Sequence, residues 1–438
     1  MMNQTTHSYG YWRFRILYST MLGYIFFYFI RKNISMAMPM IEESLGISKI
    51  QLGLFLTLHG ILYGVSRFFN GVIADRLNPR WFMGIGLLFC AIANFGFGMS
   101  SAVWTMGMFW LMNGWFQGMG FPPCAKSLTH WFAAEERGVK FSIWNTSHSL
   151  GAGLVFLLNA AILLYVHNWR FCFFIPGSLG VLGAFILFNR LCDTPESMGL
   201  EPVEKYYAEK RNRAVETVSP ENVSANANES LRATLYKYVF SNPAIWVVSL
   251  ANFFVYIVRF SILDWAPTFL KEIKHIDITS AGVVSSCYEL IGVCGMLCSG
   301  LLMDRVFHGR GSKVCFLYML GCTVTMAFFW WANSSSIVAN ALFLSVLGFF
   351  SYGPQCLIGV IVANVATKKA AAAANGLTGI WGYMSVVVTG WGIGWVAEYY
   401  DWNVVFLCLI GASFLAMILF LFSWNAIAPE QIEKKDPA

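Results

Sequence analysis

The sequence contains few charged residues. They make up 12% of its 438 residues, whereas hydrophobic residues make up 57%. A soluble globular protein carries about 25% charged residues. The composition therefore excludes a soluble globular domain and favours a helical bundle embedded in a membrane, in which each span needs about 20 apolar residues.

Patterns typical of enzymes and metal sites are also missing. The 11 cysteines lie mostly in apolar stretches, with no CxxC pair and no Cys/His cluster at metal-ligand spacing. Such cysteines behave as small buried hydrophobes. The apolar stretches contain no combination of nucleophile and base. We therefore expect no enzymatic activity, no metal and no cofactor.

Long apolar stretches are abundant instead, and about twelve of them can span a bilayer. They lie near 15–38, 51–74, 81–100, 104–126, 139–166, 169–190, 243–270, 279–303, 313–332, 336–366, 371–397 and 402–425. A polar stretch over 191–238 interrupts the series after the sixth. We predict an all-α membrane protein with a six-helix half over 1–190, a cytoplasmic linker over 191–238 and a second six-helix half over 239–438.

Basic residues are distributed unevenly between the predicted loops. Most of the 29 Lys and Arg residues share the side of the N-terminus and the linker, and only Lys49, Arg170, Lys271 and Lys274 lie on the opposite side. Cytoplasmic loops carry such an excess. We predict that both termini are cytoplasmic and that the protein lies in the inner membrane. The net charge of +6 then reflects topology and does not indicate nucleic-acid binding.

Two phrases occur once in each predicted half. Tyr28-x-x-Arg31 recurs 228 residues later as Tyr256-x-x-Arg259, and Gly71-x-x-x-Asp75-Arg76, followed by Arg80, recurs 229 residues later as Gly300-x-x-x-Asp304-Arg305. Nearly equal offsets predict a parallel repeat of two halves. The glycines should let helix ends approach closely, and the arginines should anchor each turn at the headgroups. The doubled loop resembles the signature of the major facilitator superfamily, and we expect it to gate a conformational change.

Ionisable residues inside the predicted spans are few and mostly cationic. The cations are Arg31, Lys32, Arg67 and Arg259, and the acids are Asp264 and Glu289. An arginine at mid-bilayer costs roughly 2.5–3.5 kcal/mol, so such residues are functional by default. A guanidinium can bind two phosphate oxygens at once. We interpret Arg31 and Arg259 as ligands of a phosphoryl group; alternatively, Arg259 pairs with Asp264 or Glu289.

Polar side chains recur at helical spacing beside these cations. Tyr24 and Tyr28 share a helix face with Arg31, Tyr63 precedes Arg67 by one turn, and Asn145 precedes His148 by one turn. Their hydroxyl, amide and imidazole groups can hold phosphate or sugar oxygens. The alternatives are that the tyrosines are ordinary packed aromatics and that Lys32 points away from Arg31.

The shortage of intramembrane acids favours exchange over proton coupling. Proton-driven carriers place titratable carboxylates along the transport path. An empty site with two cationic side chains should resist crossing the low-dielectric barrier until an anion neutralises it. We therefore predict anion-for-anion exchange.

Several phrases together resemble the organophosphate:phosphate antiporters of the major facilitator superfamily over nearly the whole chain. They are Arg31-Lys-Asn33, Tyr63-Gly-Val-Ser-Arg67, Phe116-Gln-Gly-Met-Gly120, Pro122-Pro-Cys124, Glu136-Arg-Gly138, Trp144-Asn-Thr-Ser-His148, Tyr256-Ile-Val-Arg259, Asp264-Trp265, Tyr352-Gly-Pro-Gln355 and Lys368-Lys-Ala-Ala371. The resemblance implies a monomeric transporter of organophosphate and inorganic phosphate that works by alternating access of two pseudo-symmetric halves in the bilayer.

The same resemblance implies roles for individual residues. Arg31 and Arg259 bind the phosphoryl group, His148 assists, and Arg67 stands where the family usually has lysine. Glu289 matches an acid of the family. The positions that line the site are Tyr24, Tyr28, Gln117, Asn145, Tyr256, Tyr352 and Tyr383.

The substrate is indicated less directly. Tyr11-Trp12-Arg13 and 81–86 resemble the hexose-phosphate branch, whereas 264–275 and 121–124 resemble the glycerol-3-phosphate branch. Asn375 and Thr378 stand where some hexose-phosphate carriers have an Asp/Lys pair. We favour hexose 6-phosphate, with glycerol 3-phosphate next. The alternative is a membrane sensor that binds sugar phosphate and signals to a partner kinase.

Overall fold

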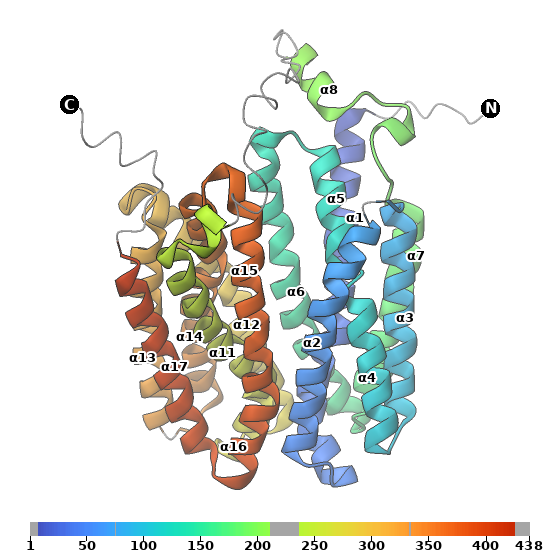
Figure 1. Cartoon of the computed structure of the whole chain (residues 1–438). Helices are drawn as coiled ribbons and strands as arrows, with labels where there is room; N and C mark the ends of the chain where they lie inside the picture. Colours follow the sequence, from blue (N-terminus) through green and yellow to red (C-terminus); the bar gives the residue numbers. More distant parts are fainter. Residues whose placement is uncertain (1–7, 75, 211–235, 333, 425–438) are drawn as a thin grey trace. The chain divides into compact units, whose positions relative to one another are not determined.

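The computed structural model describes residues 8–74, 76–210, 236–332 and 334–424, and within these ranges it is helical with no strand (Figure 1). The helices before the linker are α1 (Tyr9–Leu45), α2 (Lys49–Ala74), α3 (Pro79–Met99), α4 (Val103–Gln117), α5 (Phe121–Trp131), α6 (Ala134–Val166) and α7 (Phe171–Arg190). Those that follow are α8 (Val203–Lys210), α11 (Pro243–Glu272), α12 (Ile278–Leu301), α13 (Gly311–Trp331), α14 (Ile337–Val365), α15 (Thr367–Val387), α16 (Ile393–Tyr399) and α17 (Trp402–Phe422).

The predicted membrane fold is confirmed. Among the described residues, ten helical segments are long and apolar enough to cross a membrane. The two remaining predicted spans correspond to α1, which carries Arg31 and Lys32, and to the consecutive helices α4 and α5. Each of the predicted apolar stretches is therefore helical.

Local sequence explains where the helices begin. Asn78 precedes α3 and its side chain accepts a hydrogen bond from the Arg80 amide at 2.9 Å, with Pro79 as the first helical residue. Asp401 precedes α17 and accepts from the Val404 amide at 2.9 Å. Both arrangements satisfy amides that lack a partner within the helix. Polar capping residues therefore mark where these two apolar helices begin.

The span predicted over 104–126 is two helices rather than one. The chain turns between α4 and α5 at Gly118–Gly120, where Gly120 donates to the Gln117 carbonyl at 3.1 Å. A Cβ on Gly118 would overlap the hydroxyl of Ser66 on α2. The break therefore lets the chain pass close to α2, which only glycine permits.

Contacts divide the chain into two compact units. The N unit comprises Met1–Ala37 and Leu58–Asn222, and the C unit comprises Met38–Thr57 and Val223–Ala438. Within the N unit, α3 packs along α4 and α7; within the C unit, α12 packs along α14, and α11 along α15 and α17. The tip formed by the end of α1 and the start of α2 thus belongs to the C unit. The predicted division into halves at 191–238 stays a prediction.

The first part of the predicted linker folds against the N unit. Val203 of α8 is buried with Tyr9 and Ala133, and the rings of Tyr9 and Tyr206 stack with centroids 4.2 Å apart. Arg13 contacts both Tyr207 and Glu136. Burial alone would raise the pKa of Glu136, but the hydrogen bond and positive charge of Arg13 lower it overall.

The two copies of the Gly-x-x-x-Asp-Arg phrase begin at Gly71 and Gly300. Among the described residues, no heavy atom lies within 4 Å of a Cβ built on Gly71 or Gly300. The neighbouring residues Val72 and Leu301 are exposed. The close helix approach expected at these glycines stays a prediction. Asp304 and Arg305 lie in a short π-helix, Leu302–Val306. Arg76 is exposed, Arg80 contacts the Phe188 carbonyl, and Asp75 lies outside the described residues.

Candidate functional site

Arg31 of the N unit lies beside tyrosine rings. Its guanidinium carbon lies 4.1 Å from the ring centroid of Tyr63 on α2 and 5.5 Å from that of Tyr28 on its own helix. The negative faces of aromatic rings attract a cation by roughly 0.5–2 kcal/mol. This arrangement stabilises the guanidinium in an apolar surrounding and leaves it positively charged.

The predicted neighbours of Arg31 form one aromatic cluster. Tyr24 packs on Trp144 of α6 and on Tyr28, with ring centroids 4.7 and 5.4 Å apart. Tyr28 also contacts the His148 ring, at 5.8 Å. A Cβ on Gly151 would lie 2.9 Å from the carbonyl oxygen of Ile25, so α6 and α1 approach closely here. The helical spacing read from the sequence therefore brings Tyr24, Tyr28 and His148 together.

Four other predicted residues of the N unit have different surroundings. The Arg67 guanidinium lies over the ring of Phe121, 3.8 Å from its centroid. Lys32 is buried. Gln117 is also buried, and its amide donates to the backbone carbonyl of Phe27 at 2.9 Å. The structure thus gives Gln117 a partner in the α1 backbone. Asn145 is half-buried, and its backbone carbonyl contacts the ring of His148.

Arg259 of the C unit has an equivalent aromatic surrounding. Only 3% of the residue is exposed, and its guanidinium donates to the hydroxyl of Tyr352 at 3.0 Å. The guanidinium carbon lies 4.6 Å from the Tyr352 ring centroid and 5.2 Å from that of Phe260. Tyr352 is held in turn by Tyr288, whose hydroxyl bonds Ser351 at 2.8 Å.

The remaining predicted residues of the C unit lie on α11, the helix of Arg259, and on α12 and α15. Asp264 is 7% exposed and Glu289 is fully buried. Tyr256 and Tyr383 are half-buried, and the Tyr256 ring packs against Phe260 with centroids 5.1 Å apart. A buried carboxylate can compensate the charge of a buried guanidinium, so both interpretations of Arg259 stay open.

The tip of α2 makes a close contact inside the C unit. Lys49, Gly53 and Thr57 occur once per turn on α2 and face Gly390 and Gly394. Gly390 belongs to a π-helix over Val388–Gly392. A Cβ on Gly394 would lie 2.5 Å from the Lys49 carbonyl oxygen, and one on Gly53 would overlap the Gly390 carbonyl. Small residues permit this approach of two backbones in a membrane.

Charged and polar side chains join the same contact. The Thr57 hydroxyl donates to the Val386 carbonyl at 3.1 Å and accepts from the Trp391 amide at 2.8 Å. The Lys49 ammonium lies 2.7 Å from Glu42 and 3.2 Å from Glu272. The α2 tip is therefore held by backbone contact, hydrogen bonds and ion pairs.

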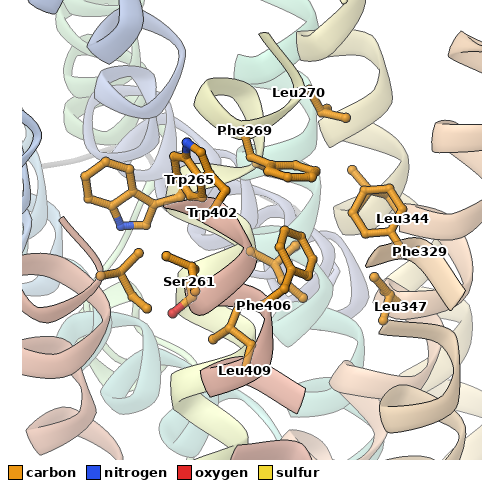
Figure 2. Close-up of a pocket in the computed structure, with 14 residues that line it drawn as sticks. Ser261, Trp265, Phe269, Leu270, Phe329, Leu344, Leu347, Trp402, Phe406 and Leu409 are labelled. Atoms are coloured by element: carbon orange, nitrogen blue, oxygen red, sulfur yellow. The ribbon is translucent and has the colours of Figure 1, made fainter. Parts of the chain in front are cut away.

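A cavity in the C unit is unsuited to an anion. Trp265, Phe269, Phe329, Trp402 and Phe406 surround it with aliphatic side chains (Figure 2). The indole nitrogens of Trp265 and Trp402 donate to the Thr389 carbonyl and to Glu272, each at 2.8 Å. Its lining therefore offers a phosphate almost no polar partner.

A buried polar group beside Arg31 consists of uncharged side chains, so the pattern of intramembrane charge does not reveal it. His59 on α2 contacts the side-chain oxygen of Asn113 on α4 at 3.0 Å, and both residues are buried. Asn113 in turn donates to the Ile30 carbonyl at 3.0 Å. Isolated amides in apolar spans are the only sequence signal for this group.

Comparison with known proteins agrees with this architecture. Residues 20–390 match the model of the Major Facilitator Superfamily. A solved bacterial homologue of the human lysosomal transporter Spinster has a TM-score of 0.69 at 15% identity, with 98% of this chain and 99% of that chain covered. At that identity the likeness concerns the fold alone.

Curated relatives are considerably more similar. A probable hexose phosphate transport protein of Chlamydia trachomatis is 40% identical, covering 95% of this chain and 92% of its own. The glycerol-3-phosphate transporter of Bacillus subtilis is 36% identical, covering 94% and 92%. The membrane sensor protein UhpC of Salmonella typhimurium is 36% identical, covering 97% and 94%. The chain is therefore a multi-pass membrane protein and not an enzyme, and it belongs to the Major Facilitator Superfamily.

Proposed function

We propose that the protein exchanges an organophosphate for inorganic phosphate across the inner membrane by alternating access. Hexose 6-phosphate is the favoured organic substrate, and glycerol 3-phosphate is next. The observation that carries the proposal is Arg259, a guanidinium only 3% exposed within a membrane-spanning helix and bonded to a tyrosine hydroxyl. Burying such a group in a membrane costs free energy, so a binding site for a ligand or a transport path is the default explanation for its presence.

The phosphoryl group is bound by one arginine from each repeated phrase, Arg31 and Arg259. Both guanidiniums lie against tyrosine rings, which stabilise a cation without neutralising its charge. The phosphoryl group also receives hydrogen bonds or positive charge from His148, Arg67 and Lys32. The side chains that contact the remainder of the substrate are Tyr24, Tyr28, Tyr63, Gln117, Asn145, Tyr256, Tyr352 and Tyr383.

Exchange follows from the charge of the site. An empty site with two guanidiniums crosses the membrane barrier slowly, whereas an anion compensates the charge and permits the change of access. Phosphate then returns the carrier after each organophosphate is released. Asp264 and Glu289 are charge partners of the arginines and compensate part of this charge, and the bound anion compensates the rest.

Vesicles containing the purified full-length protein test the proposal. Labelled glucose 6-phosphate, glycerol 3-phosphate and phosphate are each offered to vesicles loaded with phosphate and to vesicles without it. We expect rapid uptake of glucose 6-phosphate only into the loaded vesicles. Equal uptake into both kinds of vesicle would refute exchange, and preferred uptake of glycerol 3-phosphate would refute the substrate assignment.

A sensor role is the second candidate, because a relative with 36% identity is named a membrane sensor protein. A sensor would bind the sugar phosphate and alter a partner kinase without moving its ligand. Saturable glucose 6-phosphate binding without any exchange in the loaded vesicles would favour this role over transport.

A further inference from the structure

One side of α1 accepts hydrogen bonds from buried side-chain amides. Its residues Phe27 and Ile30 are at most 1% exposed. The bonds are Gln117 to the Phe27 carbonyl at 2.9 Å, Asn94 and Asn113 to the Ile30 carbonyl at 3.0 Å each, and Asn159 to the Asn33 carbonyl at 3.1 Å. Donors from α3, α4 and α6 therefore converge on two turns of α1.

These bonds supplement those within the helix. A carbonyl oxygen has two lone pairs, so the carbonyls of Phe27 and Asn33 can each accept a side-chain amide in addition to the backbone amide of the next turn. The Ile30 carbonyl accepts two side-chain amides. Each added bond fixes the position of α1 relative to a neighbouring helix. Together they determine how far α1 is rotated about its axis, and hence where Arg31 points.

Asn113 is held in one orientation. Its amide nitrogen donates to the carbonyls of Ile30 and Cys90, at 3.0 and 3.3 Å, so its oxygen must face His59. The His59 Nε2 atom lies 3.0 Å from that oxygen, which can only accept; Nε2 therefore carries a proton. A Cβ on Gly114 would lie 3.0 Å from the His59 carbonyl, so α2 and α4 are in close contact here.

We propose that Asn113, oriented by His59, is a positioning residue for Arg31. The inference rests on the proposed function, in which Arg31 binds the phosphoryl group. The chain of bonds from His59 through Asn113 ends at the carbonyl of Ile30, one residue before Arg31. A guanidinium binds two phosphate oxygens only in a fixed geometry, and a displacement of about 1 Å is enough to disturb such an arrangement.

Calorimetric titration of the purified full-length protein with inorganic phosphate tests the inference. Asn113→Leu keeps the number and branching of the side-chain heavy atoms but removes both donors. We expect phosphate to bind roughly tenfold more weakly to this variant, the effect of losing about one positioned hydrogen bond. When Asn113→Leu is added to Arg31→Lys, we expect no further weakening, because both changes act through the same guanidinium.

Asn340 provides a matched control. It is 2% exposed and donates to the carbonyls of Ser334 and Ser336, both at 2.8 Å, at the start of α14. Asn340→Leu removes two similar bonds and should leave the phosphate affinity unchanged. An equal loss of affinity in this control would show a general effect of destabilisation and overturn the positioning role.

The remaining outcomes are also decisive. Unchanged affinity of Asn113→Leu, or an equal further loss in the Arg31→Lys background, would overturn the inference. If Arg31→Lys alone leaves the affinity unchanged, the proposed phosphate ligand is wrong and the inference falls with it. Should Asn113→Leu fail to fold, His59→Gln and His59→Leu replace it: the glutamine variant, which can still donate to Asn113, should keep the affinity that the leucine variant loses.

Discussion

Replacement of Gly53 by alanine should weaken the contact between the α2 tip and the π-helix over Val388–Gly392. A Cβ on Gly53 would overlap the carbonyl of Gly390, so the two backbones must move apart. Overpacking of this kind costs about 1–3 kcal/mol. A cost of about 2 kcal/mol would favour separation of the two segments by roughly 30-fold. In the alternating access that we propose, a contact of this kind opens and closes.

Thiol accessibility measures this effect. Thr57 is 4% exposed within the contact, so a cysteine in its place should react slowly with a membrane-impermeant maleimide. We expect Gly53→Ala to accelerate labelling of Thr57→Cys in intact cells by at least several-fold, after subtraction of labelling at the native cysteines. The labelling rate reports the separated state, because the reagent cannot reach a closed contact.

The control is Gly411→Ala in α17. No heavy atom lies within 4 Å of a Cβ at this position, so the substitution should leave the labelling rate unchanged. Equal labelling rates for the Gly53→Ala protein and its parent would refute the reasoning, because the glycine contact would then contribute nothing to closure of the α2 tip.

Three further predictions concern the local structure. Asp401→Ala should lower the thermal midpoint, because it removes the hydrogen bond that the Asp401 side chain accepts from the Val404 amide. This bond lowers the pKa of Asp401 in the folded protein. Its contribution to stability is therefore present above the unfolded pKa of about 3.9 and is lost as the pH falls through the lower folded pKa. Val203→Asp should detach α8, because Val203 is only 1% exposed, and trypsin should then cleave faster at Lys205; unchanged cleavage would contradict this docking. Lys274→Met should lower the thermal midpoint by about 2 °C, because Lys274 donates to the Ala332 carbonyl at 2.6 Å at the end of α13; an unaltered midpoint would show that this cap does not stabilise the helix.

The fold was predictable because apolar length alone identifies a membrane span. Each predicted stretch is helical, and residues such as Asn78 and Asp401 show where helices begin. The break at Gly118–Gly120 was not predicted, since both sides of it are apolar and hydropathy does not register a turn. At this break Gly118 lies against Ser66, which is distant in sequence.

The candidate site was predictable where it depends on charge or on spacing within one helix. Arg31 and Arg259 are identifiable as rare intramembrane cations, and the face shared by Tyr24 and Tyr28 follows from helical periodicity. The pair His59 and Asn113 was not predictable, because α2 and α4 contribute one uncharged residue each. Only the packing of separate helices turns these residues into a support for α1.

The most direct test of the central claim is phosphate self-exchange. Vesicles loaded with phosphate and containing the wild-type protein, Arg31→Lys or Arg259→Lys are given labelled phosphate outside, and the rate of label entry is measured. The planar fork of arginine has no equivalent in lysine. We predict rapid exchange by the wild-type protein and background rates for both variants; a wild-type rate in either variant would contradict the assignment of that arginine to the phosphoryl group.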